Sequence, residues 1–422
     1  MRISIFVEHF PIPYKPYYDT QFAALEAAGH EVAIFAGGRL GRAVSEKVVR
    51  HRLLERTRYF PTTLRTVPRH LPAMVWSSLR APRGAARVLS STAGAPGTKR
   101  RFLEAARLLV TRDPEPDLCL VHGLITATLF PRLRQAHPGV PIAMYYHGGE
   151  VPSVGPVSDP AASAAFRGVD IVFTNTEFSR RQAVARGCPP DRVFVLPVGF
   201  ALEDFRPPPD RPYRRGDVLR LLSAGRMSEE KGLIHALEAV KRLVDEGIRD
   251  VHYSLVGSGY TRPALERYVR ENGLEPFVSF LGTLPSDRLV SLMGEVDALV
   301  LPSVPWGNWA ETQACAVQEA MLMKAVVVTT TIGGVPESIP PEMRPFSVPP
   351  GDSAALAAAI RSVHGLDEPR MRSLGEAGRA FVCERYEIGR LNARMLELAR
   401  SESPPREPVQ RFTDRRPRIL QA

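Results

Sequence analysis

The sequence predicts an α/β protein built from two doubly wound domains. Three observations predict it: apolar strand-like runs alternate with helical patterns, this alternation occurs twice along the chain, and a proline-rich segment separates the two series. The chain has 422 residues, of which 44% are hydrophobic and 24% are charged. This composition excludes a chain that is disordered throughout, and the length allows two sizeable cores.

The expected strands are continuous runs rich in Val, Ile and Leu. Such runs are typical of parallel strands that are buried on both faces of a sheet. In the first half they are residues 3–7, 31–36, 118–122, 142–146, 170–175 and 193–196. In the second half they are residues 219–224, 253–256, 278–281, 298–301 and 326–329.

The segments between the strands have helical periodicity. Apolar residues at i, i+4, i+7 and i+11 follow Lys231, and Gly247 is placed to end that helix. The proline-rich residues 197–212 are typical of a linker between domains. We therefore expect an N-terminal domain over residues 1–200, a C-terminal domain over residues 213–384, and a disordered polar tail over residues 401–422.

Basic residues concentrate between positions 39 and 112. This segment carries 17 Lys or Arg and three Glu, a net charge of +14, whereas the whole chain carries +10, so the rest sums to −4. One interpretation is a helical insertion whose arginines are simply solvated. The other is a face for an anionic partner, such as the surface of a membrane. Nucleic acid is not expected, because aromatic residues do not alternate with the basic ones as on a stacking platform.

Two further features indicate the cellular compartment. No apolar run approaches the roughly 20 residues that span a bilayer, and the opening MRISIFVEHF lacks a signal-peptide pattern. The cysteines are widely separated and form no CxxC pair, so we expect free thiols. We therefore expect a cytoplasmic protein. The cysteines are Cys119, Cys188, Cys315 and Cys383.

Residues 225–232, which read GRMSEEKG, follow a predicted strand and open a predicted helix. A helix N-terminus presents free backbone N–H groups, and Arg226 and Lys231 add two positive charges. The loop is therefore a candidate phosphate site. The nearby Gly257-Ser258-Gly259 lacks the third glycine of a dinucleotide fingerprint, so it indicates a turn at a strand end.

Two glutamates stand eight residues apart in ETQACAVQEA, residues 311–320. Glu311 is expected at a loop-to-helix junction, and Glu319 two turns inside the helix. Carboxylates at these places can accept hydrogen bonds from sugar and ribose hydroxyls, while the amides of residues 312–314 can face a phosphate. The other interpretation is that Glu311 only complements the helix dipole and that Glu319 is a surface residue.

Together these motifs resemble the GT-B glycosyltransferases of family 4. The series also contains Phe280-Leu281-Gly282, Leu301-Pro302-Ser303 and GGVPE at residues 333–337, in the order and spacing of that family. The resemblance covers about residues 218–345. The first half is similar only in outline, through His122 and through His147-Gly148 at predicted strand ends.

The resemblance implies two Rossmann-like domains that face a cleft, with a C-terminal helix at residues 385–400 that crosses back to the first domain. It implies retaining transfer from a nucleotide sugar, such as a UDP-linked hexose or N-acetylhexosamine, in antibiotic or polysaccharide biosynthesis. Arg226 and Lys231 would bind the diphosphate, and His147 would lie beside the sugar at the reaction centre. Neither a cofactor nor a metal is expected, because the two cations stabilise the departing diphosphate. The full donor set would be Gly225, Arg226, Lys231, Gly282, Glu311, Thr312, Gln313, Ala314 and Glu319.

The acceptor side departs from the family pattern. Residues 9–18 contain no glycine where many relatives carry a Gly-Gly loop. A soluble acceptor, a small molecule or a glycan, is favoured, and if it is cationic then Asp19, Glu150 and Asp159 are candidates to bind it. The alternative is a lipid-linked acceptor, with residues 39–112 and Trp76 at a membrane.

Two other functions stay open. A GT-B nucleotide-sugar epimerase would use the donor without an acceptor and release no free nucleoside diphosphate. A non-catalytic anion-binding protein would rest on the basic segment alone and would bind in a salt-sensitive way without turnover.

Overall fold

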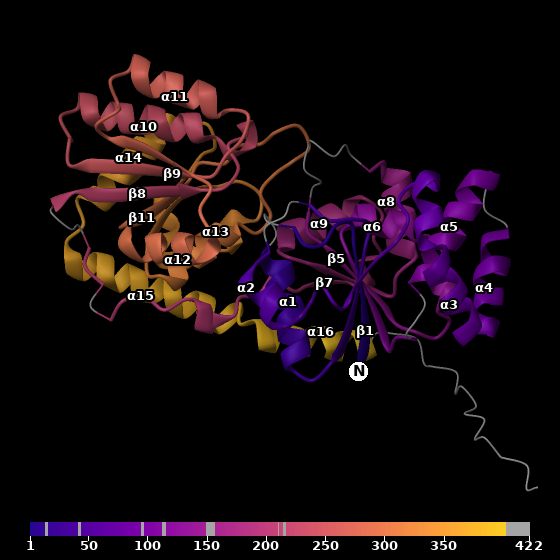
Figure 1. Ribbon diagram of the computed structural model, residues 1–422. Coiled ribbons are helices and arrows are strands. Elements are labelled where there is room, and N and C mark those ends of the chain that lie inside the picture. Colours follow the sequence, from indigo (N-terminus) through magenta and orange to yellow (C-terminus); the bar gives the residue numbers. More distant parts are fainter. Residues whose placement is uncertain are drawn as a thin grey trace, which may run out of the picture.

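The computed structural model describes residues 1–12, 16–40, 44–93, 97–111, 115–148, 157–209, 211–213 and 217–401. It contains two parallel sheets, each with helices on both faces (Figure 1). This confirms the predicted α/β architecture. The predicted tail beyond Ser401 and the acceptor candidate Glu150 lie outside the described residues.

The N-terminal sheet has seven strands in the order β3-β2-β1-β4-β5-β6-β7. All six predicted strands are present, and β3 is a seventh, which lies inside the basic segment. It was not predicted because three residues are too short to show a pattern. The bounds are β1 (Arg2–Val7), β2 (Glu31–Ala36), β3 (Thr57–Tyr59), β4 (Leu118–His122), β5 (Ile142–Tyr146), β6 (Ile171–Thr174) and β7 (Val193–Val195).

Two apolar cores lie on the two faces of this sheet. One joins β1, β2 and β4 to α1 and α16, and the other joins the sheet to α4–α8. The helices of the first half are α1 (Pro16–Ala27), α2 (Glu46–Arg50), α3 (Leu71–Arg80), α4 (Pro82–Ala93), α5 (Thr98–Val110), α6 (Leu124–Leu129), α7 (Leu133–Ala136), α8 (Asp159–Arg167) and α9 (Glu177–Ala185), with 3-10 turns η1 (Leu64–His70), η3 (Pro190–Arg192) and η4 (Leu202–Asp204).

The C-terminal sheet has six strands in the order β10-β9-β8-β11-β12-β13. The five predicted strands are confirmed, and the two-residue β13 adds to them. The bounds are β8 (Leu219–Ala224), β9 (Val251–Val256), β10 (Val278–Gly282), β11 (Ala298–Leu301), β12 (Val326–Thr330) and β13 (Ser347–Val348).

Helices cover both faces of this second sheet, with α10, α11 and α14 on one side and α12, α13 and α15 on the other (Figure 1). The predicted helix after Lys231 is confirmed as α10. The bounds are α10 (Leu233–Asp245), α11 (Arg262–Glu271), α12 (Ser286–Glu295), α13 (Cys315–Leu322), α14 (Ser353–His364), α15 (Glu368–Arg385) and α16 (Ile388–Ser401), with 3-10 turns η6 (Glu229–Lys231), η7 (Val335–Glu337) and η8 (Pro341–Phe346).

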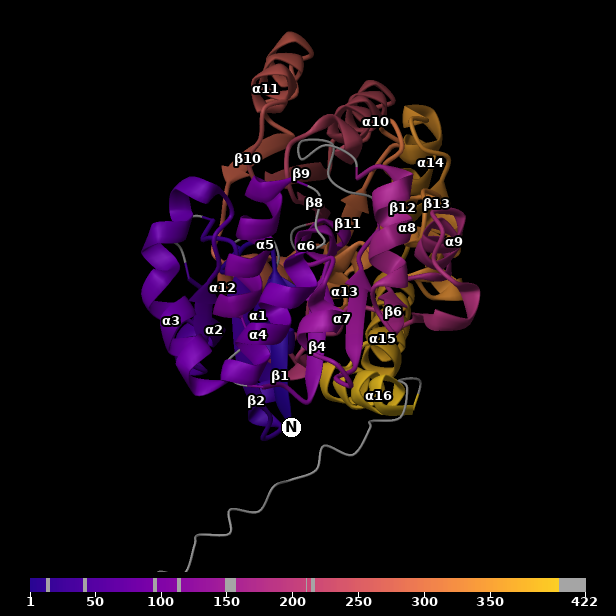
Figure 2. The ribbon, with the colours of Figure 1, turned by 90° about the vertical axis from the view of Figure 1, so that its right-hand side faces the viewer.

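The last helix returns to the first domain. Figure 2 shows α16 beside the N-terminal sheet, below α15. Gln21 of α1 donates to Asn392 of α16 at 3.4 Å, and Met395 is fully buried in the N-terminal core. The C-terminal segment therefore ties the two domains together, as the resemblance implies.

None of the helices in the described ranges is long and apolar enough to cross a membrane. All four cysteines are free, as predicted, and Cys119 and Cys188 are buried.

Candidate active site

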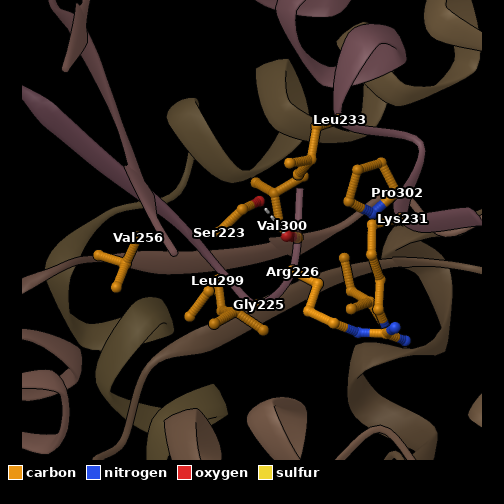
Figure 3. A pocket seen from close by; sticks show the side chains of 11 residues that line it. Ser223, Gly225, Arg226, Lys231, Leu233, Val256, Leu299, Val300 and Pro302 are labelled. Atoms are coloured by element: carbon orange, nitrogen blue, oxygen red, sulfur yellow. Dashed lines mark hydrogen bonds between the residues drawn. The ribbon is translucent and has the colours of Figure 1, made fainter. Parts of the chain in front are cut away.

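The strand order of the C-terminal sheet reverses between β8 and β11. At such a switch point the loops leave the sheet in opposite directions and open a crevice at the carboxyl ends of the strands. A pocket lies there in this structure (Figure 3). It is lined by Ser223, Ala224, Gly225, Arg226, Lys231, Leu233, Val256, Leu299, Val300, Leu301 and Pro302.

The loop after β8 is held in place by close backbone packing. Gly232 has a left-handed conformation with φ +59°, and a Cβ there would clash with the carbonyl of Pro302. A Cβ on Gly257 would clash in the same way with the carbonyl of Gly225. Only glycine allows these loops to approach so closely. Gly257 is thus part of a tight strand-end turn, as the sequence predicts.

Arg226 is held by Glu230, an acid of the GRMSEEKG motif for which the sequence predicts no role. Its guanidinium donates to Glu230 Oε1 at 3.2 Å, and Ser228 Oγ donates to the same oxygen at 2.6 Å. Glu230 is buried, whereas the Arg226 side chain is 40% exposed. Glu230 therefore orients Arg226 while the cationic end stays accessible to an anion.

Lys231 is the second cation of the pocket. Its Nζ donates to Glu311 Oε2 at 2.6 Å, and Ser303 Oγ donates to that oxygen at 3.2 Å. Nζ also lies 5.3 Å from the centre of the Trp309 ring. Glu311 is only 8% exposed, so the pair lies in a partly dry environment in which its charges act strongly. Arg226 and Lys231 both line the pocket (Figure 3).

The residues after Glu311 lead into α13. The helix begins at Cys315, so the expectation that Glu319 lies two turns inside it was wrong, and Glu319 is in the second turn. Residues 312–314 precede the helix, and Gln313 bonds across to the other domain. Its side-chain amide donates to Val198 O at 2.9 Å, and its oxygen accepts from Val198 N at 2.7 Å.

Thr312 brings the two halves of the predicted site together. Its hydroxyl donates to the carbonyl of His147 at 2.8 Å, and its methyl group packs on Gly148 so closely that no Cβ fits there. The side chains of Thr312 and Gln313 therefore hold the domains together, while Ala314 is buried at the N-terminus of α13. His147, predicted from the first half, thus lies against the Glu311 motif of the second half.

His147 belongs to a stack of rings at the end of β5. Its Nε2 is 3.2 Å from Nδ1 of His122, and its ring is nearly parallel to that of Tyr145 at 5.6 Å. Tyr17 of α1 contacts His147 at 5.2 Å between centroids. Because one of the two bonded imidazoles donates and the other accepts, the pair fixes the tautomer of His147 relative to His122. His147 also lines a second hollow, together with Tyr17, Gln21, Tyr145, Pro197, Val198, Gly199, Ile388 and Leu391.

Glu319 is half-buried on α13. Burial raises its pKa from 4.5 to about 7, and the positive charge of Lys47 opposes this rise. Lys47 belongs to α2 of the N-terminal domain, donates to Thr20 at 2.9 Å and forms an ion pair with Asp204 of η4. The environment of Glu319 is thus shaped by both domains.

Glu337, the last residue of η7, joins the two domains. Its carboxylate accepts from the backbone N–H groups of Glu177 at 2.6 Å and Phe178 at 2.9 Å, at the first turn of α9. A carboxylate is stabilised at this position by the helix dipole. The GGVPE motif therefore supports the domain interface.

Two glycosyltransferase families match the chain. The family described as "Glycosyl transferase 4-like domain" matches residues 15–199, and "Glycosyl transferases group 1" matches residues 219–365. Each match covers one of the two sheets described above. The chain is a GT-B glycosyltransferase.

The glycosyltransferase matches two curated relatives over nearly the full length of each relative. It is 24% identical to the putative colanic acid biosynthesis glycosyltransferase WcaL of Salmonella typhimurium, over 94% of this chain and 99% of the relative. It is 29% identical to the 2-deoxystreptamine glucosyltransferase of Streptomyces kanamyceticus, over 86% and 97%. The crystal structure of Anabaena HepE in complex with UDP and glucose has the same fold, with a TM-score of 0.69, 18% identity, and coverage of 95% and 100%.

Two of the three acids predicted on the acceptor side of the glycosyltransferase, Asp19 and Asp159, lie in the described residues, and each bonds to another residue. Asp19 is buried between α1 and α2, where it accepts from Ser45 Oγ at 2.6 Å, and burial raises its pKa to about 6. Asp159 pairs with Arg186 at 3.0 Å, near the start of α8. Within the described ranges, no group of three or more His, Cys, Asp or Glu side chains could hold a metal ion.

Sequence reasoning missed the residues that orient the two cations. Glu230 and Ser303 were inside quoted motifs, but nothing in their spacing shows that they reach Arg226 and Glu311. Trp309 carries a better signal, because the sequence Trp-Gly-Asn-Trp at residues 306–309 is unusual for a loop after a strand of this family. In the structure the two tryptophans form a tight turn, with backbone bonds of 2.9 and 3.1 Å between them.

Gly282 stands at the end of β10 with a left-handed φ of +69°. Its carbonyl accepts from the amide of Gly257 at 2.7 Å, so it belongs to the same packed set of loops as Gly225.

Proposed function

We propose that this glycosyltransferase transfers a hexose or N-acetylhexosamine from a UDP-linked donor to an acceptor hydroxyl, without a metal and with retention of the anomeric configuration. One observation carries the proposal: Arg226 and Lys231 meet at the switch point of the C-terminal sheet, each held by a buried carboxylate. This is the place and the charge that a diphosphate requires.

The chemistry follows from those charges. The bond between the anomeric carbon and the diphosphate oxygen breaks, the acceptor oxygen bonds to that carbon, and the acceptor's proton passes to the departing diphosphate. Negative charge builds up on the departing diphosphate, where Arg226 and Lys231 stabilise it. The backbone amides of Thr312, Gln313 and Ala314 lie just before the N-terminus of α13, and they also stabilise the negative charge of the diphosphate.

The remaining donor residues follow from the family resemblance. Glu311 accepts hydrogen bonds from sugar hydroxyls and Glu319 from the ribose, while the backbone at Gly282 reads the base. His147 lies beside the sugar. UDP is favoured as the nucleotide because the similar HepE fold was solved with UDP and glucose.

The acceptor is a glycan or a small molecule with a free hydroxyl. The names of the relatives support both, because one is a putative colanic acid biosynthesis glycosyltransferase and another is a 2-deoxystreptamine glucosyltransferase. Acceptor roles for Asp19, Asp159 and Glu150 stay predictions. Asp19 and Asp159 already bond to Ser45 and Arg186, which weakens the case for a cationic acceptor.

A screen of nucleoside diphosphate release tests the function. The enzyme is incubated with a panel of UDP-, GDP- and dTDP-sugars, with and without candidate acceptors, and the products are followed by NMR. We expect release of UDP and an anomeric coupling constant that is unchanged from donor to product. Conversion of the nucleotide sugar without release indicates an epimerase, inversion contradicts the retaining mechanism, and no turnover of any donor contradicts the proposal.

A further inference from the structure

Helix α3 turns most of its large apolar residues to solvent, although Met74 packs against the N-terminal core. Its buried residue is Ser77, while Val75, Trp76 and Leu79 are 56%, 55% and 73% exposed. A helix of a globular domain normally turns its apolar side to the core. Leu71, Val75 and Leu79 follow one another at intervals of four, so they form a single stripe along the helix. Below, the α3 surface means this stripe together with Trp76.

The α3 surface is not covered by the rest of the described chain. In Figure 1, α3, α4 and α5 lie at the end of the N-terminal domain that faces away from the C-terminal sheet. Neighbouring elements add further exposed apolar side chains: Leu64 of η1, Leu89 of α4 and Phe102 of α5. A monomeric protein rarely exposes so many large apolar residues in one region, and such regions mark interaction sites.

The charge around the α3 surface has one sign. Residues 56–103 contain no Asp or Glu. The next acid, Glu104, is buried and pairs with Arg132 at 2.7 Å, so it does not neutralise the outer face. The exposed basic residues of η1, α3, α4 and α5 are Arg65, Arg69, Arg80, Arg83, Arg87, Lys99, Arg100 and Arg101.

This combination selects among anionic partners. A polyanion such as nucleic acid binds cations and stacking aromatics, and gains nothing from a stripe of Leu and Val. An anionic bilayer rewards both features, because apolar side chains enter the acyl boundary while arginines meet the lipid phosphates. Trp76 suits the boundary itself, since tryptophan prefers the headgroup level, and Arg80 lies 4.6 Å over its ring.

We propose that the α3 surface docks on an anionic lipid membrane, with α3 lying in the headgroup region and the basic residues of η1, α4 and α5 around it. The ten residues of α3 are long enough to lie in the interface and too short to cross the bilayer. Resting on the proposed function, this docking brings the N-terminal domain to acceptors that are anchored in lipid. It therefore favours the lipid-linked acceptor over the soluble one.

Vesicle sedimentation tests the docking. The full chain is mixed with phosphatidylcholine vesicles that contain or lack phosphatidylglycerol, at low and high salt. We expect binding to the anionic vesicles that weakens with salt, and at least about a tenfold loss of affinity in the Trp76→Ala/Leu79→Ala variant. The matched control is Val195→Ala. It removes an exposed apolar side chain from β7, which is an edge strand of the N-terminal sheet and lies outside the α3 surface.

Tryptophan fluorescence gives a second readout of membrane docking, and it leaves the side chains of α3 unchanged. The chain has three tryptophans, so a Trp306→Phe/Trp309→Phe background leaves Trp76 as the reporter. We expect its emission to shift to the blue on anionic vesicles. The proposal is overturned if the wild type does not bind vesicles, or if the Trp76→Ala/Leu79→Ala variant binds them equally well. Tight binding to heparin with no blue shift of the Trp76 emission identifies a polyanion site instead. UDP affinity measured on the wild type and on the Trp76→Ala/Leu79→Ala variant, in both of which Trp309 is intact, separates these failures from a failure of the proposed function.

Discussion

Lys231→Ala removes one of the two charges that the proposed mechanism places on the diphosphate. Two unit charges 4 Å apart interact by about 4 kcal/mol at an effective dielectric constant of about 20. The Lys231 side chain is 20% exposed, so water screens part of this energy. A loss of about 3–4 kcal/mol of transition-state stabilisation remains, which lowers kcat by roughly two to three decades.

The assay is the initial rate of UDP release with saturating donor and acceptor. Removal of Lys231 also leaves Glu311 without its cation, and we expect an additional loss of about 1–3 kcal/mol in the free energy of unfolding. Thermal unfolding of the variant is measured first, so that rates are compared only where it is folded.

Lys241→Ala is the matched control, because Lys241 forms an equally short ion pair, 2.6 Å to Asp245, on α10 of the same domain. That pair is exposed at Asp245, so its loss costs no more than about 0.5 kcal/mol and the rate should not change. Near wild-type kcat in folded Lys231→Ala would refute the assignment of the diphosphate site, as would an equal loss in Lys241→Ala.

Three further predictions follow from the site. Burial raises the pKa of Glu319 above its value of 4.5 in the unfolded chain, so wild-type stability falls as the pH rises from about 4.5 to about 7, and Glu319→Gln removes this loss. The variant should unfold at a higher temperature than wild type at pH 8 and at a similar one at pH 4.5; a constant difference contradicts the burial argument. Glu337→Ala removes two hydrogen bonds at the start of α9 and should cost about 1–2 kcal/mol in urea unfolding, whereas the exposed Glu342→Ala should cost little. Activity should survive EDTA because Arg226 and Lys231 neutralise the diphosphate, and loss that Mg²⁺ or Mn²⁺ restores contradicts this reading.

The fold was largely predictable because buried parallel strands are continuous apolar runs. Eleven of these runs are strands in the structure, while β3 and β13 were missed because they are too short to carry a pattern. The spacing of the strands in the sequence does not predict their order within each sheet. That order is given by the structure.

The site was predictable where a loop motif is local in sequence. Arg226 and Lys231 belong to one short motif and line one pocket, while their role in binding a donor stays a prediction. The start of α13 was misplaced because Gln313 is held by Val198, a residue 115 positions away. The roles of Glu230, Ser303 and Glu337 also depend on contacts across the fold, which no local pattern shows.

A crystal structure with UDP bound tests the central claim most directly. We expect the diphosphate to lie within hydrogen-bonding distance of Arg226, Lys231 and the amides of residues 312–314, at the carboxyl ends of β8 and β11. UDP bound in the hollow beside Tyr17 and Ile388, or anywhere outside the pocket at the switch point, would contradict it.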